Sequence, residues 1–148
     1  MTATSTLTAT VTGPTAVPTR SRRSTTKQIR RIGVLAGLAA SVATATTAAV
    51  ASAFDVSLQV GGEAIPVIGF AQLTFVAAII GTVMAVVMSH RARRPRHTFV
   101  VSTIALTALS IVPDVIADAE TATRLVLALT HCVAAAIVIP ALASRLSD

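Results

Sequence analysis

Two ionisable side chains interrupt otherwise apolar segments of this sequence, and they are the residues that could do chemistry. Asp114 follows an uncharged run that begins at Phe99, and His131 lies within the apolar run 125–143. A carboxylate beside an imidazole can hold or pass a proton, because imidazole titrates near neutral pH and a carboxylate tunes it. Ionisable groups in apolar segments are costly and usually face the protein interior. The two side chains are therefore candidates for one polar site.

A row of hydroxyl side chains leads to the carboxylate. Four polar residues at three- and four-residue spacing share one face of a helix, namely Thr103, Thr107, Ser110 and Asp114. Pro113 immediately precedes the carboxylate, and a proline inside a helix removes a donor and clashes with the preceding turn. We therefore expect the helix to kink or end beside Asp114 and to free a carbonyl there.

Four apolar stretches must position these groups. Each can cross a bilayer, which takes about 20 mostly apolar residues. Hydrophobic residues make up 53% of the chain and charged residues 12%, which is not the composition of a soluble domain. We predict an all-α membrane protein with four transmembrane helices in an up-down bundle, spanning residues 32–54, 65–88, 99–116 and 125–143.

The charges outside the stretches alternate in sign. The segment before the first stretch and the second connector are basic, whereas the first and third connectors are mainly acidic. Lys and Arg near span ends stay cytoplasmic, so we expect both termini on the cytoplasmic side of a bacterial plasma membrane. The net charge of +6 without Trp or Tyr does not indicate nucleic-acid binding. The basic side chains either orient the protein in the lipid bilayer only or also contact anionic lipid headgroups: Arg22, Arg23, Lys27, Arg30, Arg31, Arg91, Arg93, Arg94 and Arg96.

Depth follows from this orientation, because each helical residue rises about 1.5 Å. Asp114, His131 and Gln72 lie about 8–10 Å below the outer boundary, and Thr46 and Thr47 reach a matching level in the first span. This polar layer has three interpretations: hydrogen bonds between helices, a substrate or proton site, or a metal site. One His and one Asp are too few metal ligands unless Gln72, Asp118, Glu120 or a second subunit contributes. We predict neither a metal nor a cofactor.

The N-terminal segment is rich in Thr and Ala and then basic. We predict a disordered cytoplasmic tail over residues 1–31 and a transmembrane domain over residues 32–148. A cleaved signal segment is the alternative, because Ala51-Ser52-Ala53 fits an A-x-A cleavage site after an apolar run. That run exceeds the roughly 7–15 residues of a signal peptide, which favours a retained first span.

Small residues recur at helical spacing, and in lipid such rows let helices approach closely. The first span carries the longest row, which includes Gly33, Gly37, Ser41 and Ala48. The row either packs a monomeric bundle or forms a face for a homodimer or a partner membrane protein.

Common catalytic motifs are absent from the sequence. There is one cysteine, and no G-x-S-x-G motif, phosphate loop or dinucleotide fingerprint occurs. We therefore lean away from an enzyme and favour an accessory, interaction or envelope component of the membrane. The alternative is a small proton-coupled transporter or membrane enzyme that uses Asp114 and His131 in the outer half.

Several segments resemble an uncharacterised family. The segments are FDVSL at 54–58, RARRPR at 91–96, LTALSIVPD at 106–114, LALTH at 127–131 and IVIP at 137–140. They are similar to a domain-of-unknown-function family of small four-span integral membrane proteins from actinobacteria. The resemblance covers all but the Thr-rich tail. It implies a four-helix membrane fold and assigns no activity to Asp114 or His131.

Overall fold

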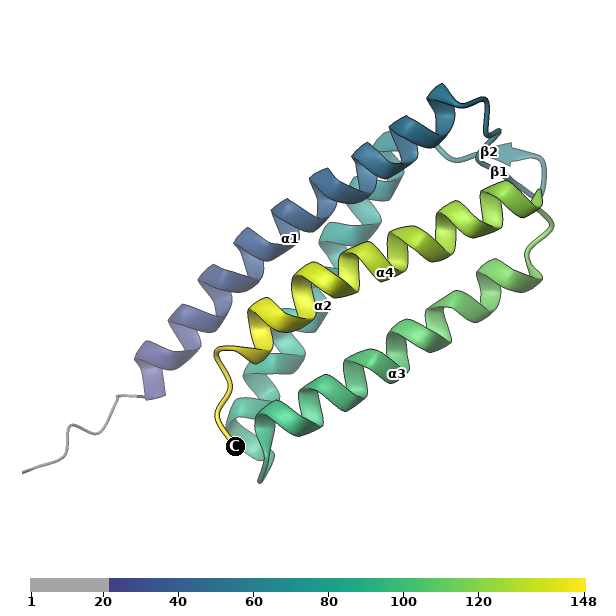
Figure 1. The fold of residues 1–148 in the computed structure, drawn as a ribbon. Helices are drawn as coiled ribbons and strands as arrows, with labels where there is room; N and C mark the ends of the chain where they lie inside the picture. Colours follow the sequence, from purple (N-terminus) through teal and green to yellow (C-terminus); the bar gives the residue numbers. More distant parts are fainter. Residues whose placement is uncertain (1–21) are drawn as a thin grey trace, which may run out of the picture.

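The computed structural model describes residues 22–148, with side chains from Thr25 onward. Four helices run up and down in sequence order, so α1 begins at the same end of the bundle at which the chain finishes (Figure 1). Each helix is long and apolar enough to cross a membrane, which confirms the predicted all-α four-helix fold. The helices are α1 (Arg22–Ala53), α2 (Val67–Arg91), α3 (Pro95–Ile116) and α4 (Thr121–Ala143).

Helix α1 starts at Arg22 rather than at residue 32, so the basic segment that we expected in a disordered tail is helical. Ile29 explains the extension, because it is fully buried in a cluster with Phe99 and Leu142. One isoleucine among polar residues adds little to a hydropathy profile, which is why the sequence did not indicate it. Residues 1–21 of the expected tail lie outside the described residues.

A short β-hairpin connects α1 to α2. Strands β1 (Gln59–Val60) and β2 (Glu63–Ala64) pair antiparallel around Gly61 and Gly62. Both glycines have positive φ, of 59° and 81°, which favours glycine at the two central positions of a tight turn. The Gly61 N–H donates to the Asp118 carbonyl at 2.8 Å. The hairpin and the α3–α4 connector are therefore joined at one end of the bundle, called here the hairpin end.

Helix α1 is the most enclosed helix and α3 the least. In the most apolar 18-residue segment of each helix, the buried share is 39% in α1 and 6% in α3. A side chain added at Gly33 would overlap Thr82 of α2, and a Cβ at Gly37 would lie 2.9 Å from the Ala78 Cβ. The small-residue row of α1 therefore packs inside the bundle, against α2.

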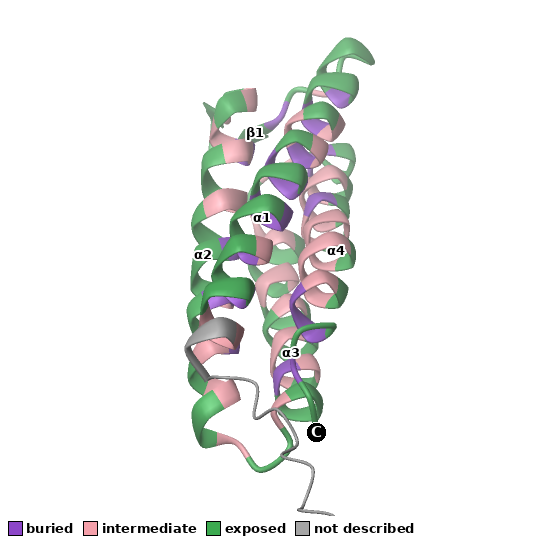
Figure 2. Ribbon diagram, turned by 90° about the vertical axis from the view of Figure 1, so that its left-hand side faces the viewer, coloured by how far each residue is buried: buried purple, intermediate pink, exposed green. Residues whose placement is uncertain are grey.

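Two apolar clusters hold the ends of the bundle. Ala48, Leu58 and Phe70 belong to the cluster at the hairpin end. The other cluster contains Ile29 and Phe99 and lies at the opposite end, where the basic segments and the C-terminus meet; we call this the basic end. Most residues on the outer faces of the helices are exposed (Figure 2). Many of them are large and apolar, as expected for helices surrounded by lipid.

Candidate functional site

The structure brings Asp114 and His131 together. The His131 Nδ1 lies 3.0 Å from the Asp114 Oδ2, across the interface between α4 and α3. The Asp114 side chain is only 12% exposed, so it is not the solvated loop residue that a helix ending at Pro113 would have given. Helix α3 continues through Pro113 to Ile116 and carries the carboxylate into the bundle.

The imidazole has two acceptors at the same nitrogen. Its Nδ1 also lies 3.0 Å from the Leu127 carbonyl, one turn earlier in α4. The hydrogen bond of this nitrogen goes to the carbonyl, and the buried Asp114 Oδ2 has no hydrogen-bond partner among the described residues. Both neighbours are acceptors, so Nδ1 carries the proton. The other ring nitrogen, Nε2, is then the atom that can accept a hydrogen bond from another molecule.

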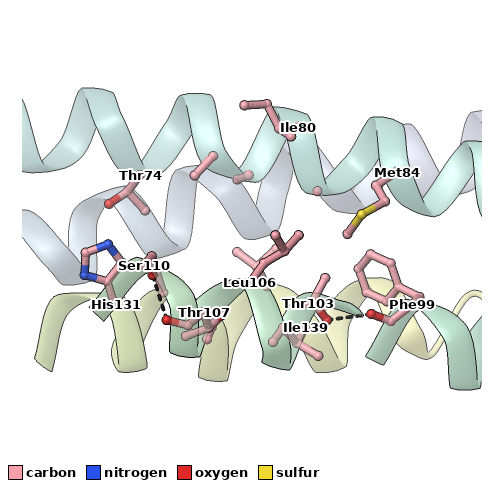
Figure 3. Close-up of a pocket in the computed structure, with 16 residues that line it drawn as sticks. Thr74, Ile80, Met84, Phe99, Thr103, Leu106, Thr107, Ser110, His131 and Ile139 are labelled. Carbon is pink, nitrogen blue, oxygen red and sulfur yellow. Dashed lines mark hydrogen bonds between the residues drawn. The ribbon is translucent and has the colours of Figure 1, made fainter. Parts of the chain in front are cut away.

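His131 also lies at one extremity of a cleft of about 300 Å³ between α2, α3 and α4. Figure 3 shows the imidazole beside Thr74 and Ser110, with Phe99 and Met84 at the far extremity. Ile80 and Leu106 line the cleft and are 63% and 53% exposed, so the cleft opens sideways between α2 and α3. A small-molecule pocket is typically about 300–1,000 Å³ and mostly apolar, which this cleft matches at the lower limit.

The hydroxyl row predicted on α3 faces this cleft. Thr103, Thr107 and Ser110 all line it. Thr103 Oγ1 donates to the Phe99 carbonyl and Ser110 Oγ to the Thr107 carbonyl, each at 2.7 Å. These bonds use the hydroxyl protons within the helix, so the oxygens facing the cleft are available as acceptors.

The other members of the predicted layer do not join the pair. Gln72 is exposed on α2, away from the residues that line the cleft. Thr46 and Thr47 donate to carbonyls of their own helix, Val42 and Ala43. Counting residues along a span predicts how deep each side chain lies. It does not predict the direction in which the side chain points.

Thr44 and Thr74 make the contact between α1 and α2 that was expected from Thr46, Thr47 and Gln72. Their hydroxyl oxygens lie 3.0 Å apart and link α1 to α2, and Thr74 also lines the cleft next to His131. Thr44 lies three residues after Ser41 and four before Ala48, two members of the small-residue row of α1, and Thr74 precedes Ala78 and Thr82 at four-residue spacing. Those rows mark the inward faces and could have identified both threonines.

The predicted headgroup contacts gather at the basic end. Lys27, Arg30 and Arg31 are exposed on α1. Four more exposed arginines lie at the end of α2, in the α2–α3 connector and at the start of α3, namely Arg91, Arg93, Arg94 and Arg96. The side chains of Arg22 and Arg23 lie outside the described part. Within residues 22–148, no three His, Cys, Asp or Glu side chains are grouped so that they could hold a metal ion.

Comparison with known proteins identifies a family. A model described as a family of unknown function (DUF6069) matches residues 24–148, which include all four helices from just inside α1. No curated protein and no solved structure matches the chain significantly. The matched region contains the cleft, the Asp114–His131 pair and the helical basic segment of α1. The chain belongs to the DUF6069 family of unknown function.

Proposed function

We propose that the protein is a multi-pass component of the cytoplasmic (plasma) membrane of an actinobacterium, with both termini inside the cell. Four apolar helices and a bundle with one basic end support this arrangement. Lys and Arg near span ends favour the cytoplasmic side, where they also meet anionic lipid. The pair Asp114 and His131 then belongs to the outer half of the membrane.

Within that membrane the protein acts by binding, as an accessory or envelope component, and the cleft is its binding site. The observation that carries this proposal is a laterally open, mostly apolar cleft that ends on one imidazole backed by a carboxylate. Such a site suits a lipid-soluble molecule that enters from the bilayer and has one hydrogen-bonding group for the His131 Nε2. No covalent chemistry is required of the chain.

A cleft-filling variant tests the proposal. Ala135 lines the cleft, whereas Ala136, its neighbour on α4, is exposed outside it. Native mass spectrometry of protein extracted from cell membranes should detect a co-purified small molecule on the wild type and on Ala136→Leu. Ala135→Leu should lose that molecule while its helix content is unchanged. Equal occupancy of the two leucine variants would contradict the cleft as the binding site.

A proton-coupled transporter or membrane enzyme is the second candidate, and the 3.0 Å contact between Asp114 and His131 is the observation that favours it. Proteoliposomes with an internal pH dye separate the two functions. A proton flux that Asp114→Asn or His131→Gln abolishes would support the transporter. Wild-type and variant vesicles with the same slow leak would support binding without proton movement.

A homodimer or a partner membrane protein is a further proposal for the lipid-facing surface. Cys132 is free and exposed on α4, so it reports on neighbours without any mutation. Oxidative crosslinking in cell membranes should yield a disulfide-linked species if α4 contacts a second copy there, and Cys132→Ala should remove it. Exclusively monomeric wild-type protein would argue against contact along this face of α4.

A further inference from the structure

The basic end of the bundle contains a second cavity, separate from the cleft. It has a volume of about 160 Å³ and is an open pocket bordered by the start of α1, the end of α2, the start of α3 and the segment after α4. Its polar lining consists of one arginine, one histidine and three hydroxyl side chains, namely Arg145, His90, Thr25, Ser89 and Ser147. A guanidinium with several hydroxyl donors is the combination that proteins use for phosphate oxygens.

Contacts between the surrounding segments hold the lining of the cavity in place. The His90 Nε2 lies 3.1 Å from the Thr26 Oγ1, which joins the end of α2 to the start of α1. Leu146 is 7% exposed and packs into the apolar cluster that contains Ile29, so this cluster anchors the segment that carries Arg145. Arg145 itself is exposed and forms no ion pair within the part of the chain that the structure describes.

The surroundings favour an anion. Seven exposed Lys and Arg side chains besides Arg145 lie at this end, three on α1 and four between the end of α2 and the start of α3. Asp148 is the single acid there among the described residues, and its Oδ1 accepts the His97 N–H at 3.1 Å. That bond shows a carboxylate already held by an amide in the first turn of α3, where the helix dipole favours negative charge.

The position of the cavity in the bundle indicates which molecule supplies the anion. The cavity lies at the ends of four membrane-spanning helices, which is the depth of lipid headgroups. Basic pockets between such helices bind the headgroups of anionic lipids. We propose that this cavity binds the phosphate of an anionic phospholipid, with Arg145 as the charged contact and the Thr25 and Ser147 hydroxyls as further donors, because the Ser89 hydroxyl already donates to the Val86 carbonyl at 2.7 Å. The proposal depends on neither the occupant of the cleft nor the orientation of the bundle.

Two matched pairs of variants test this site in the full-length protein. Arg145→Gln and Arg94→Gln each remove one exposed positive charge, but only Arg145 lines the cavity. Ser147→Ala and Ser144→Ala each remove one exposed hydroxyl, and only Ser147 lines it. The probe is phosphatidylglycerol titrated into protein in neutral detergent at 0.5 M salt, with phosphatidylcholine and inorganic phosphate as parallel arms. High salt screens the general field of the basic end.

We expect Arg145→Gln to weaken phosphatidylglycerol binding about tenfold, the size of one lost charge-assisted hydrogen bond, and Ser147→Ala to weaken it a few-fold. Arg94→Gln and Ser144→Ala should bind like the wild type, and phosphatidylcholine should bind much more weakly. Equal losses within each pair, or equal binding of the two lipids, would overturn the site. Displacement of the lipid by millimolar inorganic phosphate would assign the cavity to free phosphate and overturn the lipid proposal.

Discussion

At the scale of single residues, the contact between Asp114 and His131 could be predicted because both are ionisable and lie in apolar segments. Two costly groups at similar depth have a strong reason to meet. Gln72, Thr46 and Thr47 do not join this pair, for a different reason. Each of these can satisfy its polar atoms at the surface or within its own helix. Whether a neutral polar side chain joins an interhelical contact therefore depends on the helix face that carries it. Thr44 and Thr74 lie on the inward faces of their helices.

The energy of the Asp114–His131 contact should be small but measurable. Interhelical polar contacts in membranes average about 0.6 kcal/mol and reach about 1.7 kcal/mol. A double-mutant cycle with Asp114→Asn and His131→Gln should give a favourable coupling of that size in the free energy of unfolding in bicelles. Asp118→Asn, an exposed connector residue, serves as the control and should not couple to His131→Gln. A coupling indistinguishable from that of the control would mean that the pair does not hold α3 to α4.

At the scale of helices, hydropathy predicted the number and approximate limits of the spans. It missed the first turns of α1, because these are held by Ile29 against Phe99 and Leu142 rather than by their own apolarity. The row that contains Gly33 and Gly37 indicated a close contact between helices, but the sequence left open whether the partner was another helix of the bundle or another protein. The structure shows that the partner is α2. The cleft was not predictable, because it depends on where three helices diverge.

The glycine row makes a direct prediction about the α1–α2 interface. Gly33→Ala should destabilise the bundle by about 1–3 kcal/mol, because the added methyl group overlaps the Thr82 side chain. Gly69→Ala should leave stability unchanged or slightly raised, since the nearest atoms lie 3.7 Å away. Combining Gly33→Ala with Thr82→Ala should recover part of the loss. Thermal unfolding in one detergent compares all four proteins, and equal stability of the two single glycine variants would refute the close packing.

The extension of α1 beyond the membrane segment can be tested through its anchor. Ile29→Ala should cost about 2 kcal/mol or more, because Ile29 is fully buried and its truncation leaves a cavity. Val34→Ala should cost much less, since Val34 is 46% exposed on the outside of the same helix. Hydrogen exchange should show faster opening of residues 22–31 in the Ile29 variant only. Rapid exchange of that segment in the wild type would contradict a packed helical extension.

At the scale of the whole molecule, α1 is an enclosed member of the bundle and carries part of both apolar clusters. Removal of residues up to Ala53 would expose the inward faces of α2 and α4. We therefore expect the protein in cell membranes to retain α1 despite its A-x-A sequence. Intact mass spectrometry of C-terminally tagged protein should show a species that contains residues 22–53. Ala51→Leu blocks a signal site of this kind, so a longer product from that variant than from the wild type would show cleavage.

The orientation of the bundle decides whether Asp114 and His131 face outward, and it is the central claim of the proposed arrangement. Cys132→Ala provides a cysteine-free background, in which Gln59→Cys marks the hairpin end and Ser144→Cys the basic end without changing any charge. A membrane-impermeant maleimide applied to intact cells should label Gln59→Cys, and it should label Ser144→Cys only after permeabilisation. Labelling of Ser144→Cys in intact cells, with Gln59→Cys protected, would reverse the bundle and contradict the account.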